Sequence, residues 1–369
     1  MNAPPRAPRV ILMTVDAVGG VWRYAMDLAA GLRAQGSKIV FAGFGPKPSD
    51  QQMREAESVG RVVWLRAPLD WMVKEEAAVA YVPKLIADLA GREGADILHL
   101  NLPSQAAGLE TSLPVVVVSH SCVVTWFASV RCQAVAEEWK WQAELNRRGL
   151  DRANVVLVPS RSHGDLLEEV YGRIQELAVV YNASQVVDPQ LQKQEIVFAA
   201  ARWWDDGKNG AVLDAAAQHV DWPVMMAGPL GGPGEQSLQI SHALALGELD
   251  HLDTMMQLAQ AAIFASPSLY EPFGLAALEA ARSRCALVLS DIPTYRELWD
   301  GAALFADPRD PVAFADAINR FSHDASLRAA FANRALEVSR RFNLTTQTEG
   351  MVRHYHRLLS LKQTLNAAE

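Results

Sequence analysis

Short apolar runs alternate with helical stretches through residues 9–158, and this alternation constrains the fold more than any other feature. The first run is followed by Asp16-Ala-Val-Gly-Gly20 and an amphipathic stretch, the order of a strand, a glycine turn and a helix. Strands that alternate with helices form a parallel sheet with both faces covered. The expected strands are 9–15, 38–44, 61–65, 96–100, 115–119 and 155–158, and the expected helices include 21–34, 75–92 and 125–148.

The alternation pauses over the polar segment 182–194, which contains Pro189, and then resumes. We therefore place a domain boundary there, between a first domain at 1–185 and a second at 190–343. The pattern predicts two Rossmann-like, doubly wound sheets that face one another, with the carboxyl ends of their strands lining a ligand crevice. The expected strands of the second domain are 196–201, 223–227, 242–246, 262–265, 287–290 and 303–305, and the chain is mostly helical from 311 onward.

Composition excludes several classes of protein. At 369 residues, half of them hydrophobic, the chain is long enough for two folded domains. A net charge of −8 argues against a nucleic-acid partner. The three cysteines, Cys122, Cys132 and Cys285, have no metal-ligand spacing and favour a reducing compartment. We find no signal peptide and no membrane span, so we expect a cytoplasmic protein. A peripheral membrane contact has no support, because the charges of 125–148 are mixed.

The stretch 266–279 joins an apolar strand to a helix and carries two carboxylates, Glu271 and Glu279, eight positions apart. Between them, the backbone of Phe273, Gly274 and Leu275 is expected to open the helix, where free N–H groups and the helix dipole favour an anion. If all eight positions were helical, the two carboxylates would be about 12 Å apart along the axis. A sugar nucleotide, with its central diphosphate between two hydroxyl-rich ends, matches this pattern. Both glutamates could instead be ordinary surface residues.

Two cations flank another predicted strand-to-helix turn in the second domain. Arg202 follows the strand at 196–201, and Lys208 comes six residues later, near the start of the next helix. A cation is unfavourable at that end of a helix unless an anion lies opposite. Together the two side chains could clamp a diphosphate without a metal ion. The alternative is that both are solvated surface residues.

The first domain offers weaker signals. Gly19 and Gly20 close a strand and open a helix, but the G-x-G-x-x-G spacing of dinucleotide-binding proteins is absent. His120 follows the strand at 115–119, where ligand-facing residues collect, and small residues come after it. We therefore favour a role in a ligand site for His120. His99 also ends a strand, but a lone histidine is more often structural, and we expect a structural role for it.

These motifs resemble those of retaining GT-B glycosyltransferases, specifically glycosyltransferase family 4, GT4 (glycosyl transferases group 1). Glu271-Pro-Phe-Gly-Leu-x3-Glu279 is similar to the E-x7-E signature of that family, and Arg202 with Lys208 is similar to its R-x5-K clamp. His120 and the glycine turn also match, and the resemblance covers nearly the whole chain. The family usually has glycine before the clamp arginine, bears less bulky residues than Trp203-Trp204 after it, and often has aspartate after the histidine.

The resemblance implies roles for these residues. Arg202 and Lys208 would stabilise the departing diphosphate, so that no divalent metal is required. Glu271 would hold hydroxyls of the transferred sugar, Glu279 the ribose, and His120 would contact the donor sugar. The reaction would be a same-face substitution in which the leaving phosphate takes the acceptor's proton. The C-terminal helix, 344–369, would join the first domain. Further implied donor contacts are Gly19, Gly20, Gly228, Gly247, Leu249, Phe273, Gly274 and Leu275.

The leading hypothesis is thus a retaining, metal-independent glycosyltransferase that uses a nucleotide-sugar donor, with a UDP-sugar favoured and GDP-mannose a competitor. Its hydroxyl acceptor could be a growing glycan in polysaccharide biosynthesis, a glycolipid or a small molecule. One alternative is a catalytically idle protein of the same fold that binds sugar nucleotides. Another is a nicotinamide oxidoreductase, against which the missing glycine fingerprint argues.

Overall fold

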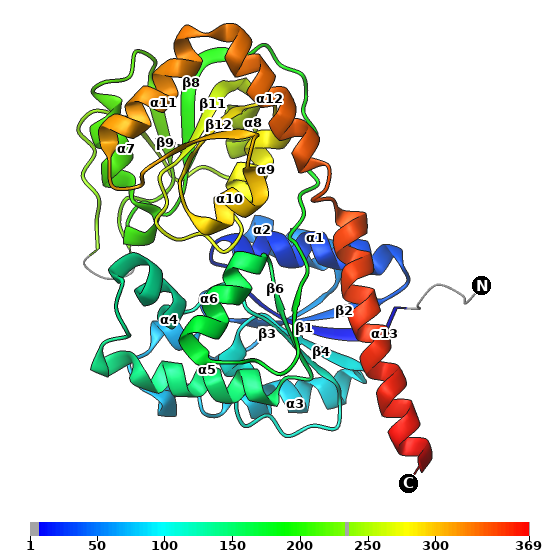
Figure 1. Ribbon diagram of the computed structural model, residues 1–369. Coiled ribbons are helices and arrows are strands. Elements are labelled where there is room, and N and C mark those ends of the chain that lie inside the picture. Colours follow the sequence, from blue (N-terminus) through cyan, green and yellow to red (C-terminus); the bar gives the residue numbers. More distant parts are fainter. Residues whose placement is uncertain (1–6, 233–235, 369) are drawn as a thin grey trace. The chain divides into compact units, whose positions relative to one another are not determined.

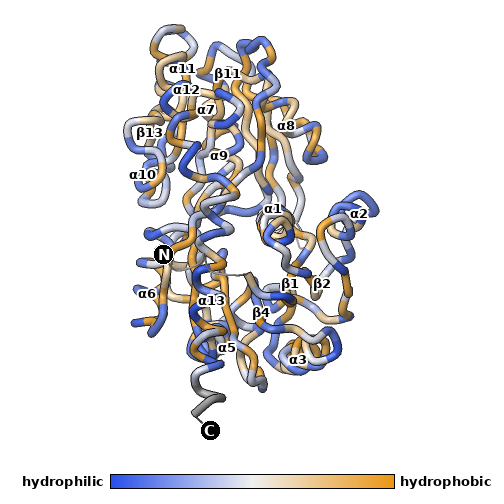
Figure 2. The backbone as a smooth tube through the Cα atoms, turned by 90° about the vertical axis from the view of Figure 1, so that its right-hand side faces the viewer, coloured by the Kyte–Doolittle hydropathy of each residue, from blue (hydrophilic) through white to orange (hydrophobic). Residues whose placement is uncertain are grey.

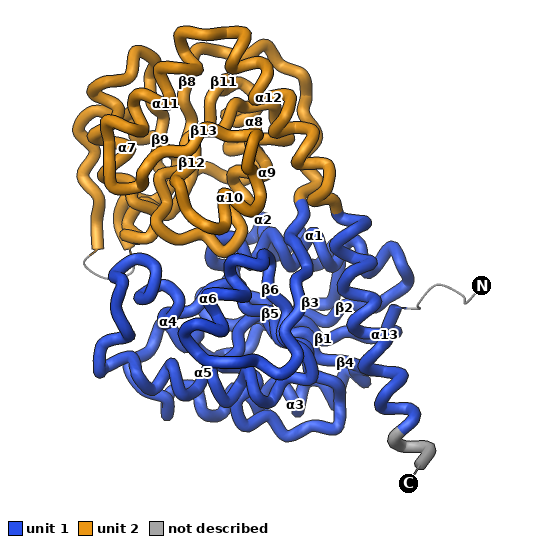
Figure 3. The backbone as a smooth tube through the Cα atoms, in the orientation of Figure 1, with its two compact units in different colours: residues 1–183, 344–369 blue, residues 184–343 orange. Residues whose placement is uncertain are grey.

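The computed structural model describes residues 7–232 and 236–368. The chain divides into two compact units, one of Met1–Ala183 with Leu344–Glu369 and one of Ser184–Asn343 (Figure 3). The boundaries predicted from the sequence were 185 and 190, with the C-terminal helix from 344 assigned to the first domain. Each unit holds one sheet in which all strands are parallel, so the predicted fold class of two doubly wound α/β sheets is confirmed. The predicted cleft between the two domains stays a prediction.

The first unit is a seven-stranded sheet in the order β3-β2-β1-β4-β5-β6-β7 (Figure 1). The order reverses between β1 and β4, which makes that point the topological switch where ligands bind in such sheets. The elements of this unit are β1 (Val10–Asp16), α1 (Gly20–Ala34), β2 (Lys38–Phe44), α2 (Asp50–Val59), β3 (Arg61–Trp64), α3 (Val82–Glu93), β4 (Ile97–Leu100), β5 (Val115–Val118), α4 (Val123–Trp126), α5 (Lys140–Arg152), β6 (Val155–Val158), α6 (Arg161–Tyr171), β7 (Leu177–Val179) and α13 (Leu344–Ala368).

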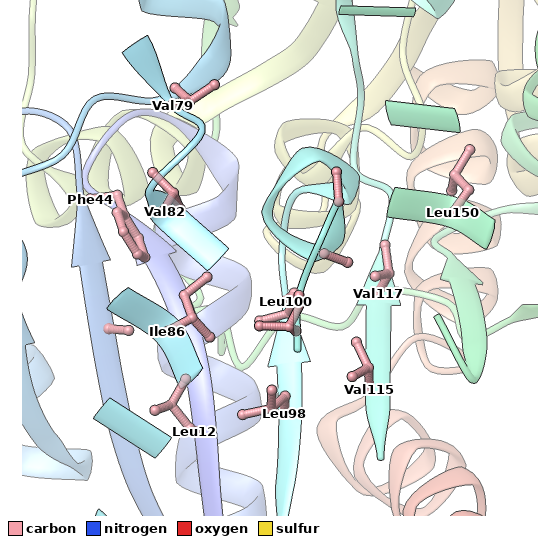
Figure 4. Packing of buried hydrophobic residues seen from close by; sticks show 14 of the residues in the cluster. Leu12, Phe44, Val79, Val82, Ile86, Leu98, Leu100, Val115, Val117 and Leu150 are labelled. Atoms are coloured by element: carbon pink, nitrogen blue, oxygen red, sulfur yellow. The ribbon is translucent and has the colours of Figure 1, made fainter. Parts of the chain in front are cut away.

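Both faces of the first sheet are buried, which explains why its strands are continuous apolar runs. Along β1, Ile11 and Met13 contribute to one core, with residues of α1 and α13. Leu12 points to the other face and contributes to a second core, with residues of α3 and α5. Figure 4 shows this second core, where Ile86 of α3 and Leu150 of α5 lie among the strand side chains. Helix α3 accordingly alternates between hydrophilic and hydrophobic residues (Figure 2).

The second unit is a six-stranded sheet in the order β10-β9-β8-β11-β12-β13, and its order reverses between β8 and β11. Residues of α7, α11 and α12 form one core with residues of β8, β9, β11 and β12. The elements are β8 (Gln194–Ala200), α7 (Gly210–Ala217), β9 (Val224–Ala227), β10 (Leu244–Gly247), α8 (His251–Gln260), β11 (Ala261–Ser266), α9 (Leu275–Arg282), β12 (Ala286–Ser290), α10 (Pro293–Trp299), β13 (Ala303–Ala306), α11 (Pro311–His323) and α12 (Ala325–Ser339).

The helix predicted at 125–148 was wrong as a single element. Helix α4 continues into a π-helical turn, Phe127–Arg131, and the chain then turns at Cys132, whose φ of 53° is left-handed. A residue with left-handed backbone ends a right-handed helix. A 3-10 turn, Glu137–Trp139, leads into α5. The helix expected from 75 begins at Val82, with Pro83 in its first turn, where a missing N–H costs nothing.

Candidate active site

Two loops meet at the switch point of the second sheet, one after β8 and one after β11. Asn209, with a left-handed φ of 57°, ends the first loop. Its side-chain Nδ2 donates to the carbonyl oxygens of Pro267 at 2.9 Å and Pro308 at 2.6 Å. The Leu269 amide donates back to the carbonyl oxygen of Gly207 at 2.9 Å. These bonds fasten the Arg202–Lys208 loop to the loop that carries Glu271.

The fastened loops bring Lys208 and Glu271 into direct contact. Lys208 lies in a 3-10 turn, Asp206–Lys208, two residues before α7, as the sequence indicated. Its Nζ donates to Oε1 of Glu271, and the two side chains are only 19% and 13% exposed. Arg202 is more open, with a 38% exposed side chain that lies 3.6 Å from Oδ2 of Asp205. One predicted clamp cation is therefore paired with the predicted sugar-binding carboxylate.

Three side-chain hydroxyl groups form a hydrogen-bonded chain that ends at the Glu271 carboxylate. Ser268 Oγ donates to the same Oε1 at 3.3 Å. Ser268 is in turn hydrogen-bonded to Ser266 at 3.3 Å, and Ser266 to the buried hydroxyl of Tyr295 at 2.7 Å. Burial, with the nearby charge of Glu271, raises the pKa of Tyr295 well above its ordinary value, so the phenol stays protonated. Sequence reasoning missed Tyr295, since nothing local links it to Glu271.

Helix α9 begins at Leu275 beside this chain, and Gly274 is its N-cap. Gly274 has a φ of 86°, and a Cβ there would lie 2.8 Å from Cε1 of Tyr295, so only glycine fits. The helix has no side-chain cap and no acidic residue in its first turn, which leaves first-turn amides available to an anion. Phe273 offers only its backbone, because its ring is 3% exposed and packs against Phe342 at 5.4 Å.

The stretch between the two glutamates is helical only in its second part. Glu271 lies in the loop before α9, and Glu279 lies within that helix, which begins at Leu275. Four helical positions rise about 6 Å. Glu279 is 8% exposed, so it is no ordinary surface residue.

The remaining predicted donor positions of the second unit lie after β9 and at the end of β10. Gly228 has a φ of 123°, and a Cβ there would lie 1.9 Å from the carbonyl oxygen of Ala201, so the backbone passes directly over the residue before Arg202. Its amide donates to the carbonyl oxygen of Gly247 at 2.7 Å. Gly247 also has positive φ, 70°, but a Cβ there would meet open space. Leu249 follows in the same loop and is partly exposed.

In the first unit, Gly19 and Gly20 lie at the start of α1, as predicted. Gly19 is the N-cap with a φ of 75°, and no side chain caps this end of the helix. Helix α2 stabilises this turn, because the side chain of Gln52 donates to the carbonyl oxygen of Ala17 at 3.2 Å. An uncapped helix start at the switch point of the sheet can accept an anion, although this feature by itself is common.

His120 lies at the carboxyl edge of the same sheet and is held by Asn101. The Asn101 Nδ2 donates to the carbonyl oxygen of Thr14 at 2.6 Å, so its Oδ1 faces His120. His120 Nε2 is 3.0 Å from that Oδ1 and must therefore carry the proton it donates. Burial, with smaller effects of His99 and His163, lowers the pKa of His120 to about 3. The imidazole is thus a neutral hydrogen-bonding group at physiological pH.

His99 is structural in the sense predicted, and it connects two helices. It is fully buried, with Nδ1 2.6 Å from the hydroxyl of Tyr355 on α13 and Nε2 3.2 Å from the hydroxyl of Tyr24 on α1. Burial lowers its pKa to about 4. The Tyr24 ring packs edge-on against His120, with 4.4 Å between ring centroids. Tyr24 and Tyr355 were missed from the sequence, because tyrosines on amphipathic helices give no signal beyond core packing.

Among residues 7–232 and 236–368, no three His, Cys, Asp or Glu side chains gather as ligands for a metal ion. No helix in the described part of the chain combines the length and the apolar character needed to cross a bilayer.

Two family models match the chain. Residues 18–185 match "Glycosyltransferase Family 4", and residues 193–338 match "Glycosyl transferases group 1". A segment of 106 residues is 36% identical to the O-antigen chain mannosyltransferase B of Escherichia coli, and it spans 28% of each chain.

Solved structures resemble the chain over almost its whole length. Sucrose-phosphate synthase from Thermosynechococcus elongatus has a TM-score of 0.80 at 17% identity, covering 96% of this chain and 100% of its own. Anabaena HepE, solved in complex with UDP and glucose, has a TM-score of 0.74 at 17% identity, covering 94% of this chain and 99% of its own. At such identities the likeness concerns the fold.

Proposed function

We propose that this chain, which belongs to the GT-B glycosyltransferases of family 4 and group 1, moves a sugar from a nucleoside diphosphate sugar to a hydroxyl acceptor with retention of configuration. One observation carries the proposal. Arg202, the Lys208–Glu271 pair and the uncapped start of α9 gather at the switch point of the second sheet. That arrangement supplies cations and amides for a diphosphate beside a carboxylate for sugar hydroxyls.

The diphosphate is assigned to Arg202, Lys208 and the first-turn amides of α9. An incoming phosphate competes with Glu271 for Lys208, and the carboxylate released from the lysine then accepts hydrogen bonds from the sugar. Because two cations stabilise the charge that develops on the leaving group, the proposed reaction needs no divalent metal. The leaving phosphate takes the proton of the acceptor hydroxyl, and Glu271 binds the sugar rather than attacking it.

His120 is assigned a contact with the donor sugar. With Nε2–H directed to Asn101 and the ring neutral, His120 can offer a polar edge without placing a positive charge beside an oxocarbenium-like sugar. We favour a UDP-sugar, because HepE was solved with UDP and glucose. GDP-mannose is the competing donor, supported by the partial match to a mannosyltransferase.

A thermal-shift panel of UDP, GDP, ADP and their sugar conjugates tests the donor, since a ligand that binds only the folded state raises the melting temperature. We expect one diphosphate to stabilise the protein, its sugar conjugate to stabilise it further, and EDTA to leave both effects unchanged. No shift with any of these nucleotides contradicts the proposed function.

Transfer is then measured with the selected donor and a panel of hydroxyl acceptors, and NMR reports the anomeric configuration of the product. Glu271→Ala and Lys208→Ala should abolish transfer while remaining folded. Lys84→Ala, at an exposed lysine paired with Asp88, is the matched control and should keep the parent rate. Folded Glu271→Ala and Lys208→Ala proteins with the parent rate overturn the assignment. Donor binding without any transfer or hydrolysis identifies a catalytically idle binding protein instead.

A further inference from the structure

The indole ring of Trp204 lies beside Arg202, the more exposed of the two cations in the proposed clamp. The guanidinium carbon of Arg202 is 5.5 Å from the centre of the Trp204 ring. At that distance a cation is attracted to the face of an aromatic ring. Trp204 is partly exposed, whereas its neighbour Trp203 is 3% exposed and donates from Nε1 to the carbonyl oxygen of Ala227 at 2.8 Å. Trp203 is therefore a core residue, and Trp204 contacts the cation.

The Trp204 ring is itself held by the loop that follows β9. A Cβ added to Gly232 would lie 2.9 Å from both Cδ2 and Cε3 of Trp204, so the backbone at Gly232 already packs directly on the ring. Two backbone bonds join residues on either side of 233–235, with Gly232 donating to Gln236 at 2.8 Å and Leu238 donating to Leu230 at 2.9 Å. The ring thus has a backbone support and is not a freely rotating surface side chain.

The contact between Arg202 and Asp205 leaves the N–H donors of the guanidinium available to a ligand. Asp205 lies 3.6 Å from the guanidinium, longer than the roughly 2.7–2.9 Å of a charge-assisted hydrogen bond. The other carboxylate oxygen, Oδ1, accepts from the Gly207 amide at 2.9 Å and so stays fixed in the turn. Within the described residues, the ring of Trp204 and the carboxylate of Asp205 are the contacts that the structure assigns to this side chain.

We propose that Trp204 is a positioning residue, which holds the Arg202 guanidinium in place to receive the diphosphate of the donor. The inference rests on the proposed function and adds a residue to that site. A long, exposed side chain loses conformational freedom when it binds an anion. A ring contact made before the ligand arrives reduces that loss, because the guanidinium is already confined. Trp204 acts through Arg202 and therefore affects the diphosphate rather than the base or the ribose.

The test compares binding of UDP and UMP, and of GDP and GMP, to the parent and to Trp204→Ala by isothermal titration calorimetry. We expect Trp204→Ala to weaken diphosphate binding about two- to tenfold, the range that one cation–π contact supports, and to leave monophosphate binding unchanged. The KM for the donor should rise by a similar factor with no change in the KM for the acceptor. Trp204→Phe keeps an aromatic face and should restore most of the lost affinity.

Trp222→Ala is the matched control. Trp222 is a second partly exposed tryptophan of the same unit that packs on an arginine, Arg328, at 4.9 Å from the ring centre. Removing it deletes the same kind of contact away from the proposed site, so the ratio of diphosphate to monophosphate affinity should equal that of the parent. A merely structural effect of losing a tryptophan would lower both affinities, and would do so in both variants.

The outcomes separate this inference from the proposed function. An unchanged ratio of diphosphate to monophosphate affinity in Trp204→Ala, with a parent protein that prefers the diphosphate, overturns the role of Trp204 alone. Failure of Trp204→Phe to recover affinity also overturns it, because the ring face would then be irrelevant. A parent protein that shows no preference for either diphosphate contradicts the proposed function and this inference together.

Discussion

Replacing Lys208 by methionine should separate the structural and catalytic roles of one ion pair. The substitution keeps the length of the side chain and removes the charge opposite Glu271. The pair is mostly shielded, with side chains 19% and 13% exposed. Breaking a fully buried pair costs about 3–5 kcal/mol, and an exposed pair contributes about 0–1 kcal/mol. Glu271 keeps one weak bond from Ser268 at 3.3 Å, so we expect a loss of about 2 kcal/mol.

Thermal unfolding, monitored by near-UV circular dichroism, measures this loss of stability. The unit that contains the pair, Ser184–Asn343, has about 160 residues, for which 1 kcal/mol corresponds to about 2–4 °C. Lys208→Met should therefore melt about 4–8 °C below the parent. Arg340→Met breaks an exposed pair of the same unit, Arg340–Glu337, whose side chains are 68% and 70% exposed, and should shift the melting temperature by less than about 2 °C.

The double variant Lys208→Met/Glu271→Gln gives the decisive comparison. Neutralising Glu271 removes the unpaired charge, so stability should recover by at least half although two native groups are missing. Transfer activity should not recover, because a cation that stabilises the leaving group contributes on the order of 10²–10³ in kcat. A single variant that melts with the parent refutes the inferred coupling of the pair. A double variant that regains activity refutes the catalytic role of Lys208.

Three further outcomes follow from the geometry. Gly228→Ala should lower the melting temperature by several degrees and weaken diphosphate binding. The added Cβ would lie 1.9 Å from the carbonyl oxygen of Ala201, and the backbone φ of 123° is strained for alanine. A variant that melts and binds the diphosphate like the parent contradicts this expectation. Burial lowers the pKa of His99 and of His163 to about 4 from 6.5, so the unfolded chain binds more protons between these values. Stability measured by urea titration should thus fall as pH drops from about 6.5 to 4, by up to about 1.4 kcal/mol per pH unit for each histidine, and His163→Gln should have a shallower slope. Tyr355→Phe leaves Nδ1 of buried His99 without its hydroxyl partner and should cost about 1–3 kcal/mol, which the same titration measures; a loss below 0.5 kcal/mol would show that the bond is unimportant.

Most of the fold could be predicted from the sequence, because strands buried on both faces must be apolar throughout. The expected strand 38–44 coincides with β2, and 155–158 with β6. The three-residue strand β7 was missed, since so short a run has no periodicity. The helix at 125–148 was overpredicted because an amphipathic pattern does not reveal a π-helical turn or the left-handed backbone of Cys132.

The sequence also nominated the residues of the candidate site, for a reason of local geometry. Arg202 follows β8 and Glu271 follows β11 of the second sheet, and the carboxyl ends of parallel strands meet at one edge of a sheet. His120 follows β5 at the corresponding edge of the first sheet. Residue type and position relative to a strand were therefore enough to nominate them. The signature spacing of Glu271 and Glu279 was informative about the family, although it combines a loop residue with a residue of α9.

Only the tertiary structure decided which side chains contact one another. Lys208 and Glu271 are 63 positions apart, and His99 and Tyr355 are 256 apart, so no local pattern links them. The order of the strands places β8 beside β11 and brings α13 back onto the first sheet, and these placements create both contacts. Alternation and strand-end residues thus determined the fold class and nominated the residues of the candidate site. The long-range packing determined which charge each group faces, and hence that Lys208 is paired with Glu271.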